Sequence, residues 1–298
     1  MNILFRCDSS QEIGLGHLNR CLILAKKLKG EIYFASRDLK GSENEKIEKE
    51  GFKRVPLKSN DFKEFKEAVL KYKIDTVIFD HYEIDEEFEK KTKELGVKTI
   101  SFDDTYEKHL SDIVINPNFG AKNRYEGNKV LFLAPLVREE FFKPQKKYAK
   151  KVKNVLISLG GSDPKNLTLK ILRILKRKKY KISVATTSSN KNLKKLKSLK
   201  REIKLYIDFP DMRRLFSKND ILILSSSTVS TEALVSKTPF ITIKTAKNQK
   251  EPFEFFKRKR FPAFDKLSHI KINSEIYKNS IKRVKSFKYK TWTDSKII

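Results

Sequence analysis

The chain has 298 residues, of which 39% are hydrophobic, so it is long enough for two folded domains and too apolar for an intrinsically disordered chain. Its 66 Lys and Arg against 37 Asp and Glu give a formal net charge of +29. A surplus of that size favours anionic partners, which include nucleic acid, an anionic membrane surface and phosphorylated small molecules. Most of it is Lys spread over every predicted helix, without a known nucleic-acid-binding motif. We therefore favour a solvated lysine surface and expect no nucleic-acid partner.

The two cysteines, Cys7 and Cys21, lie in apolar patterns without the spacing of a metal site. This predicts reduced thiols in a protein core. No apolar run approaches the length of about 18 residues that a membrane-spanning helix needs. The sequence also begins directly with a strand pattern, without the pattern of a signal peptide. We therefore expect a cytoplasmic protein with no membrane span.

The first half of the sequence alternates short apolar runs with amphipathic segments, which is the pattern of a parallel sheet covered by helices on both faces. The predicted strands are residues 2–7, 31–36, 53–57, 75–80, 98–104, 112–118 and 130–137. The predicted helices are residues 17–29, 61–72 and 85–95, with Gly30 and Gly96 as the C-terminal stops of the first and the third.

The alternation is interrupted by residues 141–153, which are basic, contain a proline and show no apolar periodicity. It then starts again with a strand from residue 154, strands at 180–186, 203–208, 220–227 and 239–245, and helices at 164–179 and 231–237. We predict two doubly wound α/β domains, residues 1–143 and 154–298, joined by a linker at 144–153. Residues 250–298 are basic and aromatic, and part of them is expected to form a helix that closes the second domain.

Each predicted domain has a glycine loop between its first strand and its first helix. Gly14 and Gly16 precede one helix, and a loop that starts at Gly160 precedes the other. Free N–H groups and the positive end of the helix dipole attract phosphate at such a place, and glycines let a ligand approach the backbone. Neither loop matches the G-x-G-x-x-G fingerprint of dinucleotide-binding domains. Both lie at the carboxyl ends of strands, where open α/β sheets bind their ligands.

His17 lies in the first turn of the first predicted helix. The helix dipole disfavours an imidazolium there, so a neutral ring could act as a general base. The alternative is a capping or surface histidine. Arg20 lies three residues later on the same helix face, where it would hold a phosphate or a carboxylate beside the imidazole, or remain a surface arginine. The other histidines without a strand-end position, His109 and His269, are predicted to be surface residues.

Polar residues also follow two of the predicted strands. Asp80, His81 and Tyr82 end one strand, and Asp103 and Asp104 end another. Paired carboxylates at this edge could bind Mg²⁺ or orient a histidine, although Asp is also common where strands end. We expect Asp80 or His81 in a site, and we expect no metal cluster.

In the second half, the hydroxyl-rich residues 225–234 join a strand to a helix and leave room for a ligand. Glu232 lies in the first two turns of that helix, where a carboxylate can bind two ribose hydroxyls. The alternative is an N-capping run with a favourable acid at the helix start. Lys247, Asn248 and Gln249 close the loop after the next strand.

Together these residues resemble the GT-B superfamily, in which two Rossmann-like domains face each other across a cleft. The segments that carry the resemblance are LFRCDSSQEIGLGHLNR, DHYEID, SFDD, LAPLVREEFF, SLGGSDPKNLTL, ATTSSNKNLKKL, LSSSTVSTEAL and IKTAKNQ, in this order. Their combination, over residues 1–250, resembles more closely the UDP-sugar hydrolases of pseudaminic acid biosynthesis. These enzymes remove UDP from UDP-2,4-diacetamido-2,4,6-trideoxy-β-L-altrose. The segment after residue 255 departs from the pattern of that family.

The resemblance implies a hydrolase without metal or cofactor, in which water attacks the anomeric carbon with inversion and His17 is the general base. Because UDP is a good leaving group, such a reaction needs a base for the water and charge stabilisation at the departing phosphate. Gly14 and Gly16 would let the sugar and the pyrophosphate approach. The other implied contacts are Arg138 on the nucleotide side, Gly161, Ser162 and Asp163 at the diphosphate, Ile207 and Asp208 at the uracil, Ser227, Thr228 and Glu232 at phosphate and ribose, and Asn248 and Gln249 at the sugar.

Three other functions remain open from the sequence. A GT-B glycosyltransferase would use the same donor site and pass the sugar to an acceptor, and a membrane-associated one would need an apolar, basic docking face on the first domain. A UDP-sugar epimerase would need an additional acid–base pair. A nucleic-acid-binding protein would bind DNA in a salt-dependent way and turn over no nucleotide sugar. We expect a monomer whose partner is a small UDP-sugar.

Overall fold

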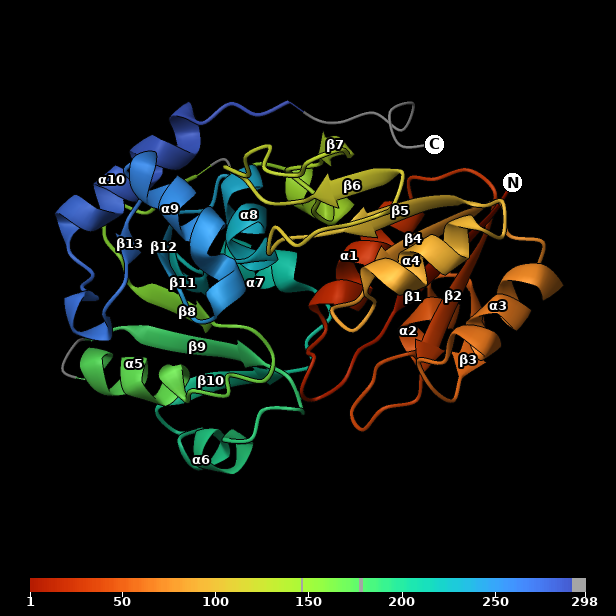
Figure 1. Cartoon of the computed structure of the whole chain (residues 1–298). Helices are drawn as coiled ribbons and strands as arrows, with labels where there is room; N and C mark the ends of the chain where they lie inside the picture. Colours follow the sequence, from red (N-terminus) through yellow and green to blue (C-terminus); the bar gives the residue numbers. More distant parts are fainter. Residues whose placement is uncertain (146, 177–178, 291–298) are drawn as a thin grey trace. The chain divides into compact units, whose positions relative to one another are not determined.

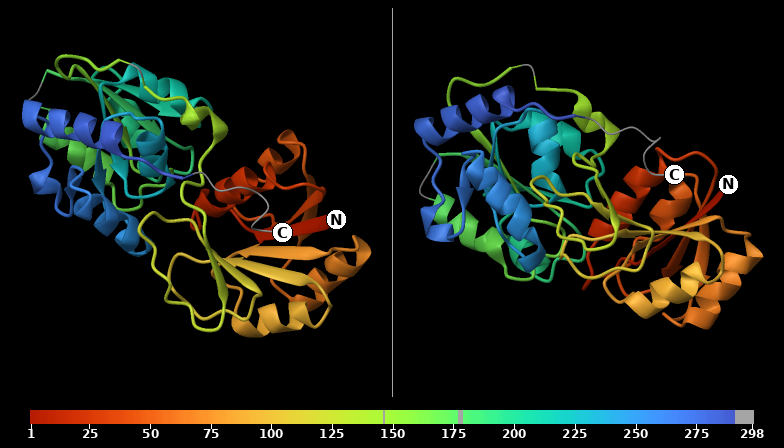
Figure 2. Two further views of the ribbon diagram at one scale, coloured as in Figure 1. Left: turned by 90° about the horizontal axis from the view of Figure 1, so that it is seen from above. Right: turned by 45° about the horizontal axis from the view of Figure 1, so that its top comes forward.

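The computed structural model describes residues 1–145, 147–176 and 179–290. Within this part of the chain the residues form two compact units, Met1–Leu136 (unit 1) and Val137–Lys290 (unit 2). The segment that we interpreted as a linker, residues 144–153, belongs to unit 2 in this division. In each unit the strands form one layer with helices beside it (Figures 1 and 2).

Unit 1 is built on a seven-stranded sheet with the order β3-β2-β1-β4-β5-β6-β7. All neighbouring strands in it are parallel, so the carboxyl ends of the strands lie at one edge of the sheet. The strands are β1 (Asn2–Cys7), β2 (Glu31–Arg37), β3 (Lys53–Leu57), β4 (Thr76–Asp80), β5 (Lys98–Phe102), β6 (Ile113–Asn116) and β7 (Lys129–Phe132). Their positions confirm the strand pattern of the first half.

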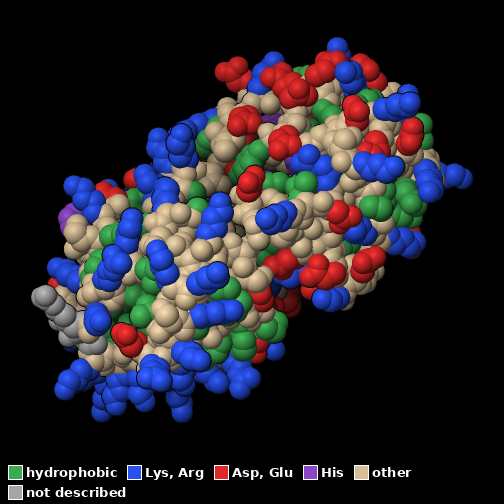
Figure 3. Space-filling view, turned by 90° about the horizontal axis from the view of Figure 1, so that it is seen from below, with side chains coloured by type: hydrophobic (Ala, Val, Ile, Leu, Met, Phe, Trp, Pro, Cys, Tyr) green, Lys and Arg blue, Asp and Glu red, His purple; other side chains and the backbone are tan. Residues whose placement is uncertain are grey.

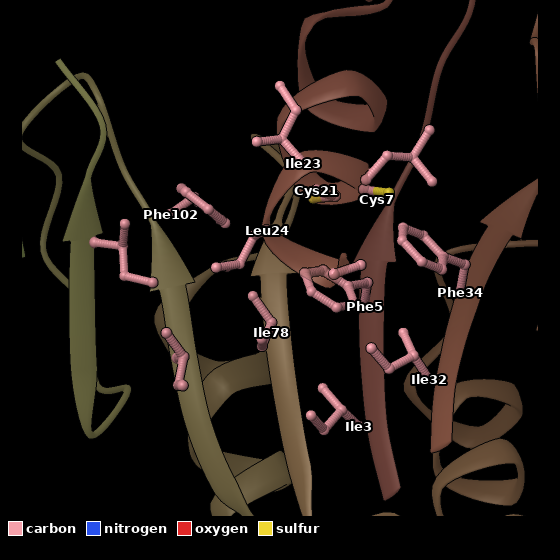
Figure 4. Packing of buried hydrophobic residues seen from close by; sticks show 14 of the residues in the cluster. Ile3, Phe5, Cys7, Cys21, Ile23, Leu24, Ile32, Phe34, Ile78 and Phe102 are labelled. Carbon is pink, nitrogen blue, oxygen red and sulfur yellow. The ribbon is translucent and has the colours of Figure 1, made fainter. Parts of the chain in front are cut away.

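Alternate residues of β1 face opposite sides of this sheet, and each side is covered by helices. Ile3 and Phe5 pack in one core cluster with buried residues of α1, while Leu4 packs in another with residues of α3. Figure 4 shows the α1 side, with Cys7 and Cys21 in the cluster. Both are buried free thiols, as the sequence predicted. The helices of unit 1 are α1 (Gly16–Ala25), α2 (Glu45–Lys49), α3 (Phe62–Lys71) and α4 (Glu86–Lys93).

The first helix is shorter than its apolar periodicity predicted. It ends at Ala25 rather than at residue 29, because the N–H groups of Lys27 and Leu28 bond to carbonyls three residues back and tighten the last turn. Gly30 then reverses the chain with a φ of +129°, where its missing Cβ leaves room for the backbone carbonyl of Met1. Strand β2 begins directly after this turn.

Unit 2 contains a six-stranded parallel sheet with the order β10-β9-β8-β11-β12-β13. Its strands are β8 (Asn154–Ser158), β9 (Lys181–Thr186), β10 (Ile203–Ile207), β11 (Ile221–Ser225), β12 (Phe240–Ile243) and β13 (Ala263–Phe264). Its helices are α5 (Leu167–Leu175), α6 (Leu193–Ser198), α7 (Met212–Lys218), α8 (Thr228–Val235), α9 (Lys250–Arg258) and α10 (Ser274–Ser286), with short 3₁₀ turns at Glu139–Phe142, Lys247–Gln249 and Leu267–His269.

The segment after residue 250, which the sequence placed only in part, completes unit 2. Helix α10 is attached to the sheet at Ser280, whose hydroxyl accepts from the N–H of Phe240 at 2.8 Å and donates to its carbonyl at 2.9 Å. Phe256 of α9 packs edge-on against the Phe240 ring. These contacts confirm that part of the segment is helix that closes the second domain. Residues 291–298 lie outside the described residues.

Candidate functional site

The polar side chains predicted at strand ends of unit 1 meet at the carboxyl edge of its sheet. Asp80 ends β4, and His81 and Tyr82 follow it. Asp104 comes two residues after β5, the neighbour of β4. Helix α1 begins at Gly16 next to this edge, because the loop after β1 leads into it. The edge therefore places an imidazole, a guanidinium and two carboxylates together.

His17 is the second residue of α1 and is only 6% exposed. Its Nδ1 lies 3.7 Å from Oδ1 of Asp80, and its ring packs edge-on against Tyr82 with 4.6 Å between the ring centroids. Burial lowers the pKa of His17, and the nearby Arg20 lowers it as well, against the raising effect of Asp80. The imidazole is thus neutral at neutral pH. This is the protonation state that a general base requires.

Arg20 is held by two carboxylates rather than left for a phosphate. Its Nε and one terminal nitrogen lie 2.6 Å from the two oxygens of Asp80, and the other terminal nitrogen lies 2.9 Å from Asp104. Burial lowers the pKa of Arg20, but Asp80 and Asp104 raise it well above its ordinary value, so it stays charged. Burial raises the pKa of Asp80, and Arg20 more than compensates, so Asp80 stays ionised. Of the two partners predicted for Arg20, the structure shows the carboxylate, and the pairing fixes the position of Asp80.

Tyr82 connects the same network to solvent. Its hydroxyl donates to Oδ1 of Asp104 at 2.9 Å, and the residue is 50% exposed. Its ring covers the side of His17, as described above. Asp80 and Asp104 are both bound by Arg20, so a guanidinium already lies where these two carboxylates could hold a cation.

A second network at this edge surrounds Asp8, which the sequence did not single out. Its carboxylate binds Arg6 at 2.8 and 3.1 Å and Arg37 at 2.6 Å, and His81 Nε2 lies 2.9 Å from it. The N–H of Glu83 donates to Nδ1 of His81, so Nε2 carries the hydrogen and donates to Asp8. Burial alone would raise the pKa of Asp8, but His81 and Arg6 hold it far below its usual range.

The His81 side chain is therefore buried against Asp8, and its contact with a substrate stays a prediction. In the sequence, Arg6 could have indicated this network, because it is a charged residue inside the apolar run of the first strand. It is 0% exposed in the structure. A buried charge needs a buried partner.

His109 is not the surface residue that we predicted. Its side chain is only 11% exposed, with Nδ1 at 2.7 Å from Glu89 of α4 and Nε2 at 4.0 Å from Asp103. Burial lowers the pKa of His109, but the carboxylates of Asp103 and Glu89 raise it to about 9. Asp103 also accepts from the Tyr125 hydroxyl at 2.6 Å. This group holds the loop after β5 in place, and Asp103 is therefore structural. His269, in contrast, is 58% exposed, as predicted.

The first glycine loop folds on itself before α1. The N–H of Gly14 donates to the Ser10 carbonyl at 2.8 Å, and Gly14 has a φ of +82°, which favours glycine. Gly16 is exposed, and a Cβ there would meet no atom within 4 Å. The space beside His17 is therefore open at Gly16.

In unit 2 the structure brings together Arg138 and Glu232, which the sequence predicted separately. Arg138 precedes the turn Glu139–Phe142, and its Nε donates to Oε1 of Glu232 on α8 at 2.9 Å. Burial raises the pKa of Glu232, and Arg138 opposes that effect. The Arg138 guanidinium also lies over the Phe141 ring at 4.8 Å. The two residues form a fixed ion pair beside the start of α8.

The second glycine loop lies between β8 and α5, as the sequence predicted. Gly160 has a φ of +95°, and Gly161 packs so close to Thr187 that a Cβ would lie 2.7 Å from its hydroxyl. Ser162 is partly exposed. Asp163 is buried, and its carboxylate accepts from the N–H groups of Leu167 and Thr168 at 2.9 and 2.8 Å. Its side chain therefore caps α5, and a contact of Asp163 with a diphosphate stays a prediction.

The remaining predicted residues lie at the carboxyl ends of the unit 2 strands. Ile207 ends β10, and Asp208 follows with its carboxylate accepting from the N–H of Ser188 at 2.9 Å. Ser227 is the residue before α8, with no side-chain capping bond, and Thr228 begins the helix in an exposed position. They lie at the edge of the sheet where open α/β sheets bind their ligands.

Asn248 and Gln249 form part of the short turn after β12. Asn248 is exposed. The side-chain oxygen of Gln249 accepts from the N–H of Thr245 at 2.8 Å and from its hydroxyl at 3.0 Å. Gln249 thus stabilises the loop, while Asn248 is accessible.

Two structural features are absent from the described residues. No group of three or more His, Cys, Asp and Glu side chains within them is arranged to hold a metal ion. No helix in the same part of the chain has both the length and the apolar character needed to cross a bilayer.

Comparison with solved structures identifies the fold. MurG of Acinetobacter baumannii aligns with a TM-score of 0.62 over 96% of this chain and 95% of its own, at 13% identity. The spinosyn rhamnosyltransferase SpnG, complexed with thymidine diphosphate, aligns with a TM-score of 0.61 over 96% and 92%, at 10% identity. With its two parallel-sheet α/β units, the chain has a GT-B-like fold.

Sequence comparison is more specific. No protein-family model matches the chain. An uncharacterised protein of Methanocaldococcus jannaschii, MJ1062, is 34% identical over 289 residues, which cover 87% of this chain and 59% of that protein. The UDP-2,4-diacetamido-2,4,6-trideoxy-β-L-altropyranose hydrolase of Campylobacter jejuni is 38% identical over 273 residues, which cover 88% of this chain and 98% of that enzyme. The chain therefore belongs to the family of UDP-2,4-diacetamido-2,4,6-trideoxy-β-L-altropyranose hydrolases.

Proposed function

We propose that this protein hydrolyses UDP-2,4-diacetamido-2,4,6-trideoxy-β-L-altrose to UDP and the free sugar, by attack of water on the anomeric carbon with inversion. Its similarity to the Campylobacter jejuni hydrolase supports the substrate and the reaction. The observation that carries the mechanism is His17, a buried imidazole with a lowered pKa that faces an ionised carboxylate.

In this proposal His17 takes the proton of the attacking water. Asp80 faces Nδ1, which favours the tautomer with the hydrogen on that nitrogen and leaves Nε2 as the proton acceptor. The distance of 3.7 Å is longer than a hydrogen bond, as is common before substrate binds. Arg20 is a positioning residue, since its two bonds to Asp80 fix the carboxylate that orients the imidazole.

We propose that unit 2 binds the UDP portion. Glu232 presents a carboxylate held by Arg138, suited to accept hydrogen bonds from ribose hydroxyls. Ser227 and Thr228 stand at the start of α8, where N–H groups and the helix dipole favour a phosphate. Ile207 and Asp208 would contact the uracil, and Asn248 the sugar.

Turnover in ¹⁸O-water, with both products read by mass, tests the reaction. Label in the free sugar supports attack at the anomeric carbon. Label in UDP would show attack at phosphorus and refute the mechanism while keeping the substrate. Absence of turnover would favour the alternative that the fold neighbours suggest, a GT-B glycosyltransferase that needs an acceptor.

The role of His17 is tested by His17→Ala, with His269→Ala as a matched control at an exposed position. We expect the first variant to bind UDP like the parent chain and to lose turnover by roughly 10²–10⁴-fold, the usual contribution of a general base. The control should keep full turnover. Unchanged turnover in His17→Ala would refute the role.

The same proposal includes a place in pseudaminic acid biosynthesis, which serves flagellin glycosylation, a cytoplasmic location and a monomeric state. The relative's substrate supports the pathway. The two buried free thiols support a reducing compartment. Size-exclusion chromatography with light scattering tests the monomer.

A further inference from the structure

Unit 2 contains a cavity that the proposed reaction does not use. It has a volume of about 470 Å³ and lies between α5, α6 and the starts of β9 and β10. Figure 1 shows α5 and α6 beside these two strands. Its apolar lining residues are Leu169, Leu172, Leu175, Ile182, Leu199 and Ile203. Charged side chains line it as well, so the cavity suits a ligand that has both an apolar and an ionic part.

The cavity lies at the opposite edge of the sheet from the candidate nucleotide residues. Ile182 and Ile203 are the second residue of β9 and the first of β10, whereas Ile207 ends β10. Because β9 and β10 are parallel, their starts share one edge and their ends the other. A ligand in this cavity would therefore be distinct from a nucleotide at the carboxyl edge.

The surface around the cavity carries a dense positive charge. The described residues 167–176 and 179–204 contain twelve Lys and Arg and one acidic residue, Glu202, so they supply +11 of the net charge of +29. Arg173, Lys176 and Lys195 line the cavity together with Glu202. Figure 3 shows many Lys and Arg side chains and few acidic ones over the lower left of the molecule as seen from below. Ile174 of α5 adds an apolar side chain that is 38% exposed.

We propose that this face of unit 2 docks on anionic lipid at a membrane surface, with a hydrocarbon group of the lipid in the cavity and its anionic headgroup on the surrounding Lys and Arg. Binding to an anionic surface through the Lys and Arg alone would leave the cavity empty. The cavity has an apolar wall and a basic rim, so its occupant should carry an apolar group next to an anionic one. An anionic lipid has both parts that the site matches. Basic residues near an anionic bilayer each strengthen binding by about fivefold.

Sedimentation with lipid vesicles tests the proposal at about 0.15 M salt. Vesicles of phosphatidylcholine mixed with phosphatidylglycerol are compared with vesicles of phosphatidylcholine alone, and a DNA duplex serves as the second polyanion. The charge variant changes three exposed lysines of α6, Lys194, Lys195 and Lys197, to Gln. Its matched control makes the same change at three exposed lysines of unit 1, Lys63, Lys66 and Lys90.

A second variant tests the cavity without changing the charge. Ser198 is exposed at the cavity wall, so Ser198→Phe narrows the cavity from its rim. Circular dichroism and thermal unfolding check that each variant is folded.

We expect the parent chain to sediment with the anionic vesicles only, and the α6 variant to bind them about 100-fold more weakly. The unit 1 control should bind the anionic vesicles about as tightly as the parent, and Ser198→Phe should bind more weakly than the parent. Equal losses in the two lysine variants, or full binding by Ser198→Phe, would overturn the proposal. So would binding to the DNA duplex without binding to anionic vesicles.

Discussion

Replacement of His109 by Gln should remove a stabilising ion pair whose contribution depends on pH. In the folded chain the pKa of His109 is raised to about 9, against an ordinary value of 6.5. At about 1.4 kcal/mol per pH unit, that difference corresponds to roughly 3 kcal/mol of stability. The side chain keeps 11% exposure, and Asp103 is 4.0 Å away, beyond hydrogen-bond distance. We therefore expect about 2–3 kcal/mol.

The sign follows from the direction of the shift. Because the folded state binds the proton more tightly than the unfolded state, the stabilisation is fully present below pH 6.5. It is lost progressively as the pH rises through the folded value of about 9. Unfolding by urea at several pH values from 6 upward should therefore show a difference between the parent and His109→Gln that shrinks as the pH approaches 9 and passes it.

Hydrogen exchange of the β5 and β6 amides assigns the effect to unit 1, because His109 and Asp103 lie in the segment between these strands. His269→Gln is the matched control, since this histidine is 58% exposed. It should change stability little at any pH. A difference for His109→Gln that stays constant from pH 6 to pH 9.5, or grows with pH, would refute the reasoning.

Three further predictions concern the site. The acidic limb of the kcat/KM profile should have its midpoint below pH 6.5, since burial lowers the pKa of His17, and a midpoint above 6.5 would contradict a buried neutral base. Gly16→Ala should leave the stability unchanged or raise it by up to about 1 kcal/mol, because the added Cβ meets open space in a helix. The same variant should lower kcat/KM, because the Cβ would stand where we propose that the substrate approaches. Gly14→Ala, with its φ of +82°, should instead lower stability in the same melting experiment. Glu232→Gln should weaken UDP binding by about tenfold or more in calorimetry, as expected for lost hydrogen bonds to a charged group, whereas Glu140→Gln, at the edge of the same ion pair, should not.

The sheets could be predicted because buried parallel strands appear in a sequence as short apolar runs. Helices α6 and α7 were missed, since each has six or seven residues and a largely basic sequence, too short for a visible apolar period. The end of α1 was misplaced for a related reason. Leu28 continues the apolar period of the helix, but the chain must turn there to begin β2. The local sequence contains no pattern that indicates this turn.

Within the candidate site, the sequence indicated single residues, but it did not indicate which side chains they pair with. Asp80 and His17 were found because a strand end and a helix start each have a local signature. The network of Asp8 could not be found in the same way, because Arg6 and Arg37 lie in two strands and His81 follows a third, far apart in the sequence. The burial of His109 was hidden for the same reason, since Glu89 and Asp103 belong to different elements.

The ion pairs of the three arginines in unit 1 indicate which part of the substrate each unit is suited to bind. Arg6 and Arg37 are both engaged by Asp8, and Arg20 is engaged by Asp80 and Asp104, so the charges at the unit 1 edge neutralise one another. Buried pairs of this kind add little net stability, but they hold side chains in one geometry. Such an edge suits an uncharged diacetamido sugar beside His17 better than a pyrophosphate. We therefore propose that unit 2 stabilises most of the charge that leaves with UDP, which makes Glu232, rather than Arg20, the residue to test for nucleotide binding.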